Sequence, residues 1–276
     1  IIPEAYGGMG LEQDSVSNAL ALEALAYGDL SLSMSVSVPL LVAQIISEHG
    51  SEEQKGELLP KLVNGSIFHV GLGINNSLLS TDPYQSDVTA EENGKEIILN
   101  GSKTGVAFAN QANTFLISAS NESDECNLYF INKDQEGVTL EDKDFMGLKG
   151  APLSQINLSN CKINASQKLG GHNYSINYEA LVDSSRIGMS ALALGVCQAV
   201  LDYVVPYTNE RVAFDEPISN RQSVAFMVAD MAIETEALRL MIYKSAALKD
   251  LGEDFHKQAS LTYRFAAHHA MKIGTD

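Results

Sequence analysis

The spacing of apolar residues changes twice along this 276-residue chain, and this change restricts the fold more than any other feature. From 12 to 65 the apolar residues recur at helical spacing, as in SVSNALALEALAYG, which ends at Gly28. From about 66 to 163 short β-rich runs such as TFLISAS and NLYFIN replace them, and after about 170 long helical patterns return. The order predicts an α+β fold and argues against a Rossmann nucleotide-binding domain, in which strands and helices alternate.

Three local signals predict where elements begin, turn or end. Ser51, followed three residues later by Gln54, forms the capping-box pattern at a helix start. Asn100 and Gly101, inside EIILNGSKTGVAF, accept the positive φ of a tight turn and predict a hairpin. Pro206 is expected to kink or stop the long apolar helix that begins near 178.

A later helix, within RQSVAFMVADMAIETEALRLMIYKSAALKDLG, carries an apolar stripe at helical spacing. We expect this stripe to face a bundle core. Its members are Phe226, Ala229, Ile233, Ala237 and Leu240. A third helix is expected over 253–273.

The charge balance limits the partners of the chain. Eighteen basic against thirty-five acidic residues give a net charge of −17, which argues against nucleic acid or an anionic membrane surface as a partner. We expect no membrane span, on the view that no apolar stretch reaches the ~18–20 residues required. Three separated cysteines without a C-x-x-C predict a reducing compartment, and the histidines lack metal spacing, so no metal site is expected. This favours a cytoplasmic location, or the mitochondrial matrix if the source is eukaryotic.

The segment TNERVAFDEPISNRQS places two cations, Arg211 and Arg221, ten residues apart in a chain with few basic residues. A ligand that carries phosphates would need a local basic site of this kind, because the overall field of the protein is negative. The alternative is a loop arginine that pairs with nearby acids, for which Glu210, Asp215 and Glu216 are available.

Several segments, in this order along the chain, resemble the acyl-CoA dehydrogenase family. They are IPEAYGGMGLEQ, HGSEEQKGELLPKLVNG, ILNGSK, GLKGAPLSQINLSNCKI and VDSSRIGMSALALGVCQAVLDYVVPYTNERVAFDEPISNRQ. The resemblance implies an N-terminal helical region over 1–65, a middle antiparallel β-domain over 66–165, and over 166–276 the start of a C-terminal helical bundle that is incomplete here. It also implies FAD as cofactor and a homo-oligomer, a tetramer built as a dimer of dimers.

The resemblance also implies a reaction. In this family a Glu removes the α-proton of an acyl-CoA thioester while a hydride passes to the flavin, and electron-transfer flavoprotein is the expected electron acceptor. In one type of member this Glu directly precedes the arginine that matches Arg186, and this chain has Ser185 there. A hydroxyl without a base beside it cannot abstract such a proton, so we expect the catalytic residue to lie outside this chain or to be missing.

The resemblance assigns roles to two groups of residues. Arg211, Phe214 and Gln222 match residues that reach across a dimer interface to the FAD of the neighbouring subunit, with Arg221 as a weaker candidate. Asp183 and Arg186 match a pair that contacts the CoA portion of the substrate. The alternative for this second pair is an ion pair at i,i+3 on a helix surface.

Two segments that should receive the chain's own flavin depart from the family pattern. Where the family has Thr-Glu-Pro-Gly-x-Gly-Ser-Asp, this chain reads NNSLLSTD, with Asn75, Ser80 and Thr81 as candidate flavin contacts and Thr81 also near the substrate. Where the family has Trp-Ile-Thr, it has Gly105, Val106 and Ala107, and the whole chain contains no Trp.

Three interpretations follow. The first is an FAD-dependent acyl-CoA dehydrogenase that packs its flavin differently, with Phe108 or Phe115 nearby. The second is a non-catalytic, flavin-poor subunit of a hetero-oligomer with a catalytic paralogue. The third is an acyl-CoA oxidase-like relative.

Overall fold

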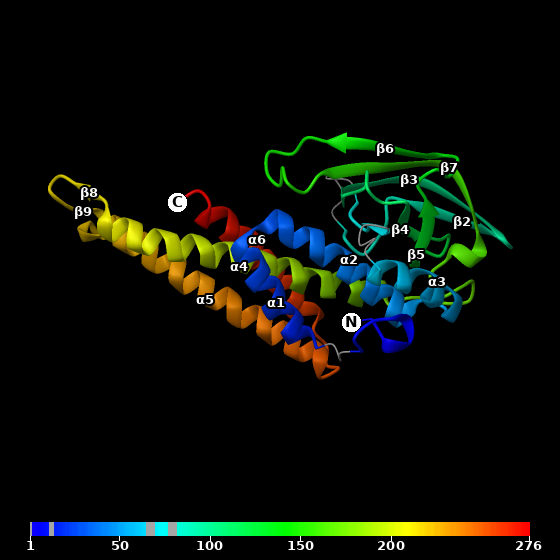
Figure 1. The fold of residues 1–276 in the computed structure, drawn as a ribbon, viewed down its shortest axis with the longest axis horizontal. Helices are drawn as coiled ribbons and strands as arrows, with labels where there is room; N and C mark the ends of the chain where they lie inside the picture. The colour runs from blue at the N-terminus through cyan, green and yellow to red at the C-terminus, as the bar shows by residue number, and fades with distance from the viewer. Residues whose placement is uncertain (1, 11–13, 65–69, 77–81) are drawn as a thin grey trace. The chain divides into compact units, whose positions relative to one another are not determined.

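A computed structural model describes residues 2–10, 14–64, 70–76 and 82–276 of the chain. The chain forms two compact units. The first unit comprises Ile1–Glu12 and Met34–Glu179, and the second comprises Gln13–Ser33 and Ala180–Asp276. The predicted α+β class, with helices before and after a β-domain, is confirmed (Figure 1). The exact domain limits at 65/66 and 165/166 stay predictions.

The first unit begins with helices, and side chains close in sequence cap the start of one of them. It contains the short 3-10 helix η1 (Glu4–Tyr6), most of α2 (Leu30–His49) and α3 (Glu52–Val63). The predicted capping box at the start of α3 is confirmed, because the Ser51 hydroxyl accepts from the Gln54 amide and the Gln54 side chain accepts from the Ser51 amide. Gln54 also donates to the Lys168 carbonyl at 2.8 Å, so one side chain both starts the helix and fixes a distant turn.

A sheet of seven strands forms the rest of the first unit. The strands are β1 (Val70–Gly73), β2 (Thr89–Asn93), β3 (Glu96–Ala107), β4 (Thr114–Ser120), β5 (Cys126–Asn132), β6 (Val138–Lys143) and β7 (Leu153–Asn164). Their order is β1-β4-β2-β3-β7-β6, with β5 paired to β4. Most pairings are antiparallel, whereas β1 with β4 and β2 with β4 are parallel. The short helix η2 (Ala165–Gln167) follows β7.

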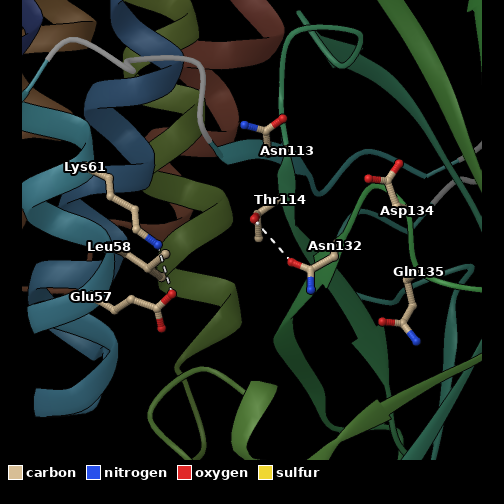
Figure 2. A pocket seen from close by; sticks show the side chains of 8 residues that line it. All are labelled: Glu57, Leu58, Lys61, Asn113, Thr114, Asn132, Asp134 and Gln135. Atoms are coloured by element: carbon tan, nitrogen blue, oxygen red, sulfur yellow. Dashed lines mark hydrogen bonds and ion pairs between the residues drawn. The ribbon is translucent and has the colours of Figure 1, made fainter.

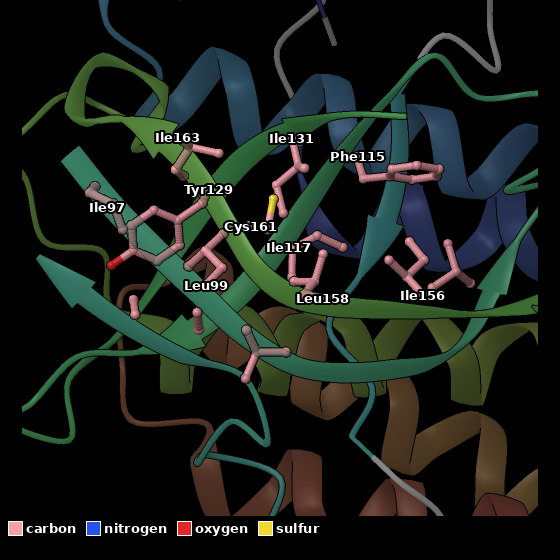
Figure 3. Packing of buried hydrophobic residues seen from close by; sticks show 14 of the residues in the cluster. Ile97, Leu99, Phe115, Ile117, Tyr129, Ile131, Ile156, Leu158, Cys161 and Ile163 are labelled. Atoms are coloured by element: carbon pink, nitrogen blue, oxygen red, sulfur yellow. The ribbon is translucent and has the colours of Figure 1, made fainter. Parts of the chain in front are cut away.

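The core of the β-domain is built from alternate residues of these strands (Figure 3). Phe115 and Ile117 of β4, Ile131 of β5 and Ile156 of β7 are fully buried in this cluster. Burial of each such side chain contributes about 1.5–3 kcal/mol to stability. Buried and less buried positions alternate along the first half of β7, so a slip of one residue there would turn its apolar side chains outward, whereas β4 and β5 are buried on both faces.

The predicted hairpin turn at Asn100–Gly101 is wrong. These residues lie inside β3, where the register against β7 shifts between Leu99 and Gly101. The turn between β2 and β3 is instead made by Gly94 and Lys95, directly after Asn93, and Gly94 has a φ of 64°. Gly101 is needed for another reason, since a Cβ there would lie 2.3 Å from the Asp87 carbonyl oxygen.

Four helices make up the second unit, which has its own core. They are α1 (Ser15–Gly28), α4 (Tyr178–Glu210), α5 (Gln222–Asp250) and α6 (His256–Ile273). Ala19 of α1, Leu194 of α4, Ile242 of α5 and Ala266 of α6 are buried in one apolar cluster. α1 approaches α4 closely at Gly195, where a Cβ would lie 2.2 Å from the Glu23 carbonyl oxygen.

Two predictions about these helices need correction. α4 continues through Pro206 to Glu210, and the hydroxyl of Thr208 and the amide of Asn209 both donate to the carbonyl of Val205. Proline removes only its own N–H, and here it lies in the last turns of the helix, so α4 ends four residues after Pro206 and not at it.

The apolar stripe of α5 does not face the core of the described chain. Phe226, Ile233 and Leu240 are 63%, 66% and 62% exposed, and the buried face of α5 instead carries Leu238 and Ile242. The helix is therefore apolar on two faces, and helical spacing alone could not tell which of them packs inside.

The expectation about membrane spans also needs correction. Leu30–His49 and Tyr178–Glu210 are both long and apolar enough to cross a membrane by length and composition. Many of the uncharged positions in Leu30–His49 are serines, which the count of apolar residues missed. One or two such helices are weak evidence for a membrane, because core helices of globular proteins meet the same criteria.

Candidate functional site

An arm joins α4 to α5 and lies at the far end of these helices within the second unit (Figure 1). It runs from Arg211 to Gln222 and contains a small hairpin, β8 (Val212–Ala213) with β9 (Glu216–Pro217), and the 3-10 turn η3 (Ile218–Asn220). The hairpin register leaves only Phe214 and Asp215 in the turn. The arm contains the residues predicted to reach a neighbouring flavin.

Arg211 begins the arm and presents an available cation. Its backbone is fixed, because its amide donates to the Tyr207 carbonyl and its carbonyl accepts from the Ile218 amide, both at 2.9 Å. Its side chain is exposed, and among the described residues none pairs with it. The nearby acids that could have neutralised it, Glu210 and Asp215 among them, do not do so.

Phe214 and Gln222 lie on the same arm and are also exposed. Phe214 is 86% exposed, which is unusual for a ring that could have been buried elsewhere. Gln222 is the first residue of α5, and its amide has no partner among the described residues. An unpaired guanidinium, an exposed ring and a free amide on one arm form a set that suits an anionic ligand with planar rings.

The two segments predicted to receive the chain's own flavin are close together. The Thr104 amide donates to the Asn75 carbonyl at 3.1 Å, at the point where β3 bulges between Lys103 and Val106. Gly105 has a φ of 65°, and a Cβ there would meet only the Asn75 side-chain nitrogen, at 3.5 Å. The structure thus places Asn75 beside Gly105. Ser80 and Thr81 lie outside the described residues.

The described residues of this receiving edge offer few side-chain groups to a flavin. Gly105 has no side chain, and the methyl group of Ala107 is 6% exposed and can donate no hydrogen bond. The aromatic substitutes suggested by the sequence are not available either. Phe115 is fully buried in the β-domain core, and Phe108 is 6% exposed and packs with Met34 in a separate cluster.

A buried lysine behind this edge escaped the sequence analysis as a functional candidate. Lys103 is 0% exposed, and its Nζ donates to Asn76 Oδ1 at 2.6 Å and to Ser86 Oγ at 2.8 Å. Burial lowers the pKa of Lys103 to about 8, and Asp87 and Cys126 offset only part of that effect. Lys103 belongs to the ILNGSK motif, but a motif alone does not show that its lysine is buried among neutral hydrogen-bond acceptors.

Asp183 and Arg186 form an ion pair, with Arg186 Nη1 3.0 Å from Asp183 Oδ1. The pair also joins α4 to α6, because Arg186 donates to Ser260 Oγ at 2.8 Å and Asp183 Oδ2 lies 2.8 Å from His256 Nδ1. Asp183 is 1% exposed. Asp183 and Arg186 therefore do form the i,i+3 ion pair of the alternative interpretation, but this pair is buried and does not lie on the helix surface. The CoA-binding role stays a prediction.

Ser185, at the position of the base in one type of member, does not act as a base here. Its hydroxyl donates to the Val182 carbonyl at 2.7 Å within the same helix. Among the described residues, no group of three or more His, Cys, Asp or Glu side chains could hold a metal ion.

One surface cavity of the first unit is lined by none of the predicted site residues. It has a volume of about 480 Å³ and lies between α3 and the ends of β4 and β5 (Figure 2). Its lining is polar and includes Lys61, which pairs with Glu57 at 2.9 Å, and the amides of Asn113 and Asn132. All these groups lie at the surface, so the cavity gives no separate indication of function.

Models of one protein family match the chain in three consecutive parts. The N-terminal, middle and C-terminal domains of acyl-CoA dehydrogenase match residues 1–66, 78–161 and 177–276. The probable acyl-CoA dehydrogenase FadE25 of Mycobacterium tuberculosis is 32% identical over 283 residues, which cover 100% of this chain and 72% of that protein. This chain belongs to the acyl-CoA dehydrogenase family. The resemblance read from the sequence is confirmed.

Solved structures of family members support the same conclusion for the fold. Butyryl-CoA dehydrogenase from Megasphaera elsdenii matches with a TM-score of 0.83 and 30% identity, over 99% of this chain and 73% of that chain. A glutaryl-CoA dehydrogenase from Mycobacterium smegmatis in complex with FADH2 matches with a TM-score of 0.84 and 27% identity, over 98% and 69%. The predicted class of FAD-dependent dehydrogenase, and FAD as its cofactor, are confirmed at the level of the family.

The predicted FAD site has two parts, the arm and the receiving edge, and only the arm offers side chains that fit FAD well. The arm fits, because Arg211 is an unpaired cation for a pyrophosphate and Phe214 and Gln222 are exposed beside it. The receiving edge offers the amide of Asn75 and backbone groups, but no side chain at Gly105 to stack on a ring.

Proposed function

We propose that this chain works in an oligomeric acyl-CoA dehydrogenase that uses FAD to form an α,β double bond in an acyl-CoA thioester. Within that oligomer, its arm contributes Arg211, Phe214 and Gln222 to a flavin held mainly by a neighbouring subunit. The observation that carries the proposal is the Arg211 guanidinium, which is exposed and unpaired among the described residues of a protein with a net charge of −17. Membership of the family supports the acyl-CoA substrate and electron-transfer flavoprotein as the electron acceptor.

The arm is suited to this role by charge and shape. A pyrophosphate bound by an acidic protein needs a fixed donor, and arginine keeps its charge at every physiological pH. Bound FAD supplies the hydride acceptor of the reaction, while the arm of this chain would hold the dinucleotide and fix its position. Asp183 and Arg186 are the proposed CoA contacts, and the three free, buried cysteines are compatible with the proposed cytoplasmic location.

The test is flavin retention in the assembled oligomer. Arg211→Met should lower the amount of bound flavin, with an affinity loss of about 10-fold, as expected for one charged hydrogen bond. Arg264→Met is the matched control, because Arg264 is an exposed arginine of α6 outside the arm. If Arg211→Met keeps the same flavin content as the control, the arm does not bind flavin and the assignment is wrong.

A second candidate function is favoured by the receiving edge. At Gly105 this chain has no stacking ring, and at Ala107 it has no hydroxyl donor, where family members carry them. At Ser185 it has no base, where one type of member carries a Glu. We therefore propose, as the alternative, a flavin-poor subunit that supports a catalytic paralogue.

The absorption spectrum separates the two candidates. Purified alone, a subunit of the first kind shows the flavin bands with about one flavin per chain. A subunit of the second kind is colourless alone, and its complex with the paralogue carries fewer flavins than chains. Full flavin content in the chain alone would eliminate the second candidate.

A further inference from the structure

The turn at the tip of the arm is strained. Phe214 has a φ of 59° and Asp215 a φ of 65°, the two positive values of a type I′ hairpin turn. Aspartate tolerates this region because its short side chain can bond locally, but a bulky aromatic residue does not. Placing a non-glycine residue there costs about 1–3 kcal/mol, and such strain persists only where the surroundings impose it.

Arg221 is the residue that offsets this strain. Its guanidinium carbon lies 4.7 Å from the centroid of the Phe214 ring, within the range of a cation–π contact. Its Nη2 also lies 3.5 Å from the carbonyl oxygen of Ala213, at the base of the same turn. These contacts join Phe214 and Ala213 to a residue seven and eight positions further along the chain.

Arg221 is itself held firmly. It lies between η3 and α5, where its amide donates to the Ile218 carbonyl at 3.1 Å. Its own carbonyl accepts from the amides of Val224 and Ala225, both at 3.0 Å. The base of the side chain is therefore part of the first turn of α5, and a rigid helix end holds the guanidinium over the ring.

The two arginines of the arm have different environments. Arg211 is exposed and unpaired among the described residues, whereas Arg221 is half-buried and its Nε is buried without a hydrogen-bond partner. The Arg221 guanidinium is thus occupied with stacking, not with an anion. Phe214 nevertheless remains 86% exposed, so the guanidinium leaves most of the ring open to a planar ligand.

We infer that Arg221 is a positioning residue, which holds Phe214 as a preformed aromatic platform for a planar ring of the dinucleotide, while Arg211 binds its phosphates. The inference rests on the proposed function, because it concerns how the same arm recognises FAD. Preformation matters because a ring already fixed loses less conformational entropy when a ligand stacks on it.

The absence of tryptophan from the chain provides a direct test. Phe214→Trp introduces a single indole at the platform, and its time-resolved fluorescence anisotropy reports how firmly the ring is held, with or without flavin. In this background, Arg221→Met should at least double the amplitude of fast local rotation, and Arg221→Lys should restore part of the rigidity through its charge. Arg264→Met should leave the rotation unchanged.

The second measurement is flavin binding by the oligomer, with Phe214 intact. Arg221→Met should weaken FAD binding by about threefold to fivefold, and Arg221→Lys by less, as expected for one cation–π contact that positions a ring. Circular dichroism should show the same helix content in all variants, because the contact lies at an exposed tip.

The outcomes separate this inference from the proposed function. If Arg221→Met leaves the anisotropy unchanged, Arg221 does not hold the ring and the inference is wrong. If the ring is released but FAD binds as in the unaltered arm, the contact only stabilises the turn, and the positioning role is again refuted. If Arg211→Met also fails to affect flavin, the proposed function fails and the inference fails with it.

Discussion

Replacing Lys103 by methionine should change how the stability of the first unit depends on pH. Lys103 is fully buried, and among the described residues its ammonium group donates to the neutral oxygens of Asn76 and Ser86 and to no carboxylate. A charge buried in this way costs free energy, since its hydration is lost and Cys126 and Asp87 offset only part of that loss. Methionine has a similar length and no charge, so Lys103→Met removes that cost together with the two hydrogen bonds.

The size of the effect follows from the pKa. Burial lowers the pKa of Lys103 from 10.5 to about 8, and at about 1.4 kcal/mol for each tenfold change this corresponds to about 3 kcal/mol. Below pH 8 both the folded and the unfolded chain hold the proton, so the full cost is present. Between about pH 8 and pH 10.5 the folded protein has lost the proton while the unfolded chain keeps it, so the stability of the wild type rises with pH.

The variant lacks this dependence, and the comparison of the two proteins is therefore the measurement. At pH 7 the relief of about 3 kcal/mol is offset by two lost hydrogen bonds worth about 1–3 kcal/mol in total, so the two stabilities should be similar. Between pH 7 and pH 10 the wild type should gain about 2–3 kcal/mol on the variant.

Urea unfolding at several pH values, followed by circular dichroism, gives both stabilities. Buried thiols such as Cys161 and Cys197 have raised pKa values, because burial disfavours the thiolate, and lower the stability in alkaline solution, but they do so equally in both proteins. Lys95→Met, at an exposed position of the β2–β3 turn, is the matched control and should show a constant difference. A difference between wild type and Lys103→Met that changes by less than about 1 kcal/mol from pH 7 to pH 10 would refute the reasoning.

Three further predictions concern packing. Gly101→Ala should lower the stability by about 2–4 kcal/mol, because the φ of Gly101 is 131° and the added methyl would press on the Asp87 carbonyl. Gly56→Ala, in α3 and with no atom near the added Cβ, should raise the stability by about 0.5–1 kcal/mol in the same urea assay. Glu23→Ala should cost about 1–3 kcal/mol, since Arg239 and Tyr243 lose the carboxylate that joins α1 to α5, although Arg239 keeps its pair with Glu236; an unchanged unfolding midpoint would contradict this. The three cysteines, all buried and with pKa values raised to about 11, should react with a thiol reagent only after unfolding, and prompt labelling of the native protein would show that the burial is wrong.

The parts of the fold that the sequence predicts are those decided by residues close together in the chain. The capping box of Ser51 and Gln54 is confirmed because both partners lie within one helical turn. The two Asn-Gly pairs show the limit of such signals. Asn93–Gly94 and Asn100–Gly101 have the same turn propensity, and only the pairing of β3 with both β2 and β7 decides that the chain turns after Asn93 and not at Asn100.

In the candidate site, too, the sequence predicts what depends on neighbouring residues and not what depends on distant ones. The arm is continuous in sequence, so its residues could be grouped in advance, although the exposure of Arg211 and its lack of a partner among the described residues could not. Arg186 contacts Ser260 and its partner Asp183 contacts His256, each more than seventy residues further along the chain and in another helix. No local pattern predicts a contact between such distant segments.

The position of α1 has a consequence for how the protein is made. Helix α1, Ser15–Gly28, lies in the same compact unit as α4, α5 and α6. Asp250, the last residue of α5, accepts hydrogen bonds from the amides of Ser15 and Val16 at the start of α1. A ribosome that adds about 5–20 residues per second completes α5 roughly 10–50 s after α1 has been synthesised. During that interval α1 has no partner helix while the whole β-domain is translated. The second unit can therefore form only after the strands have been synthesised, and a gene fragment encoding α4 to α6 alone would produce a bundle without its first helix.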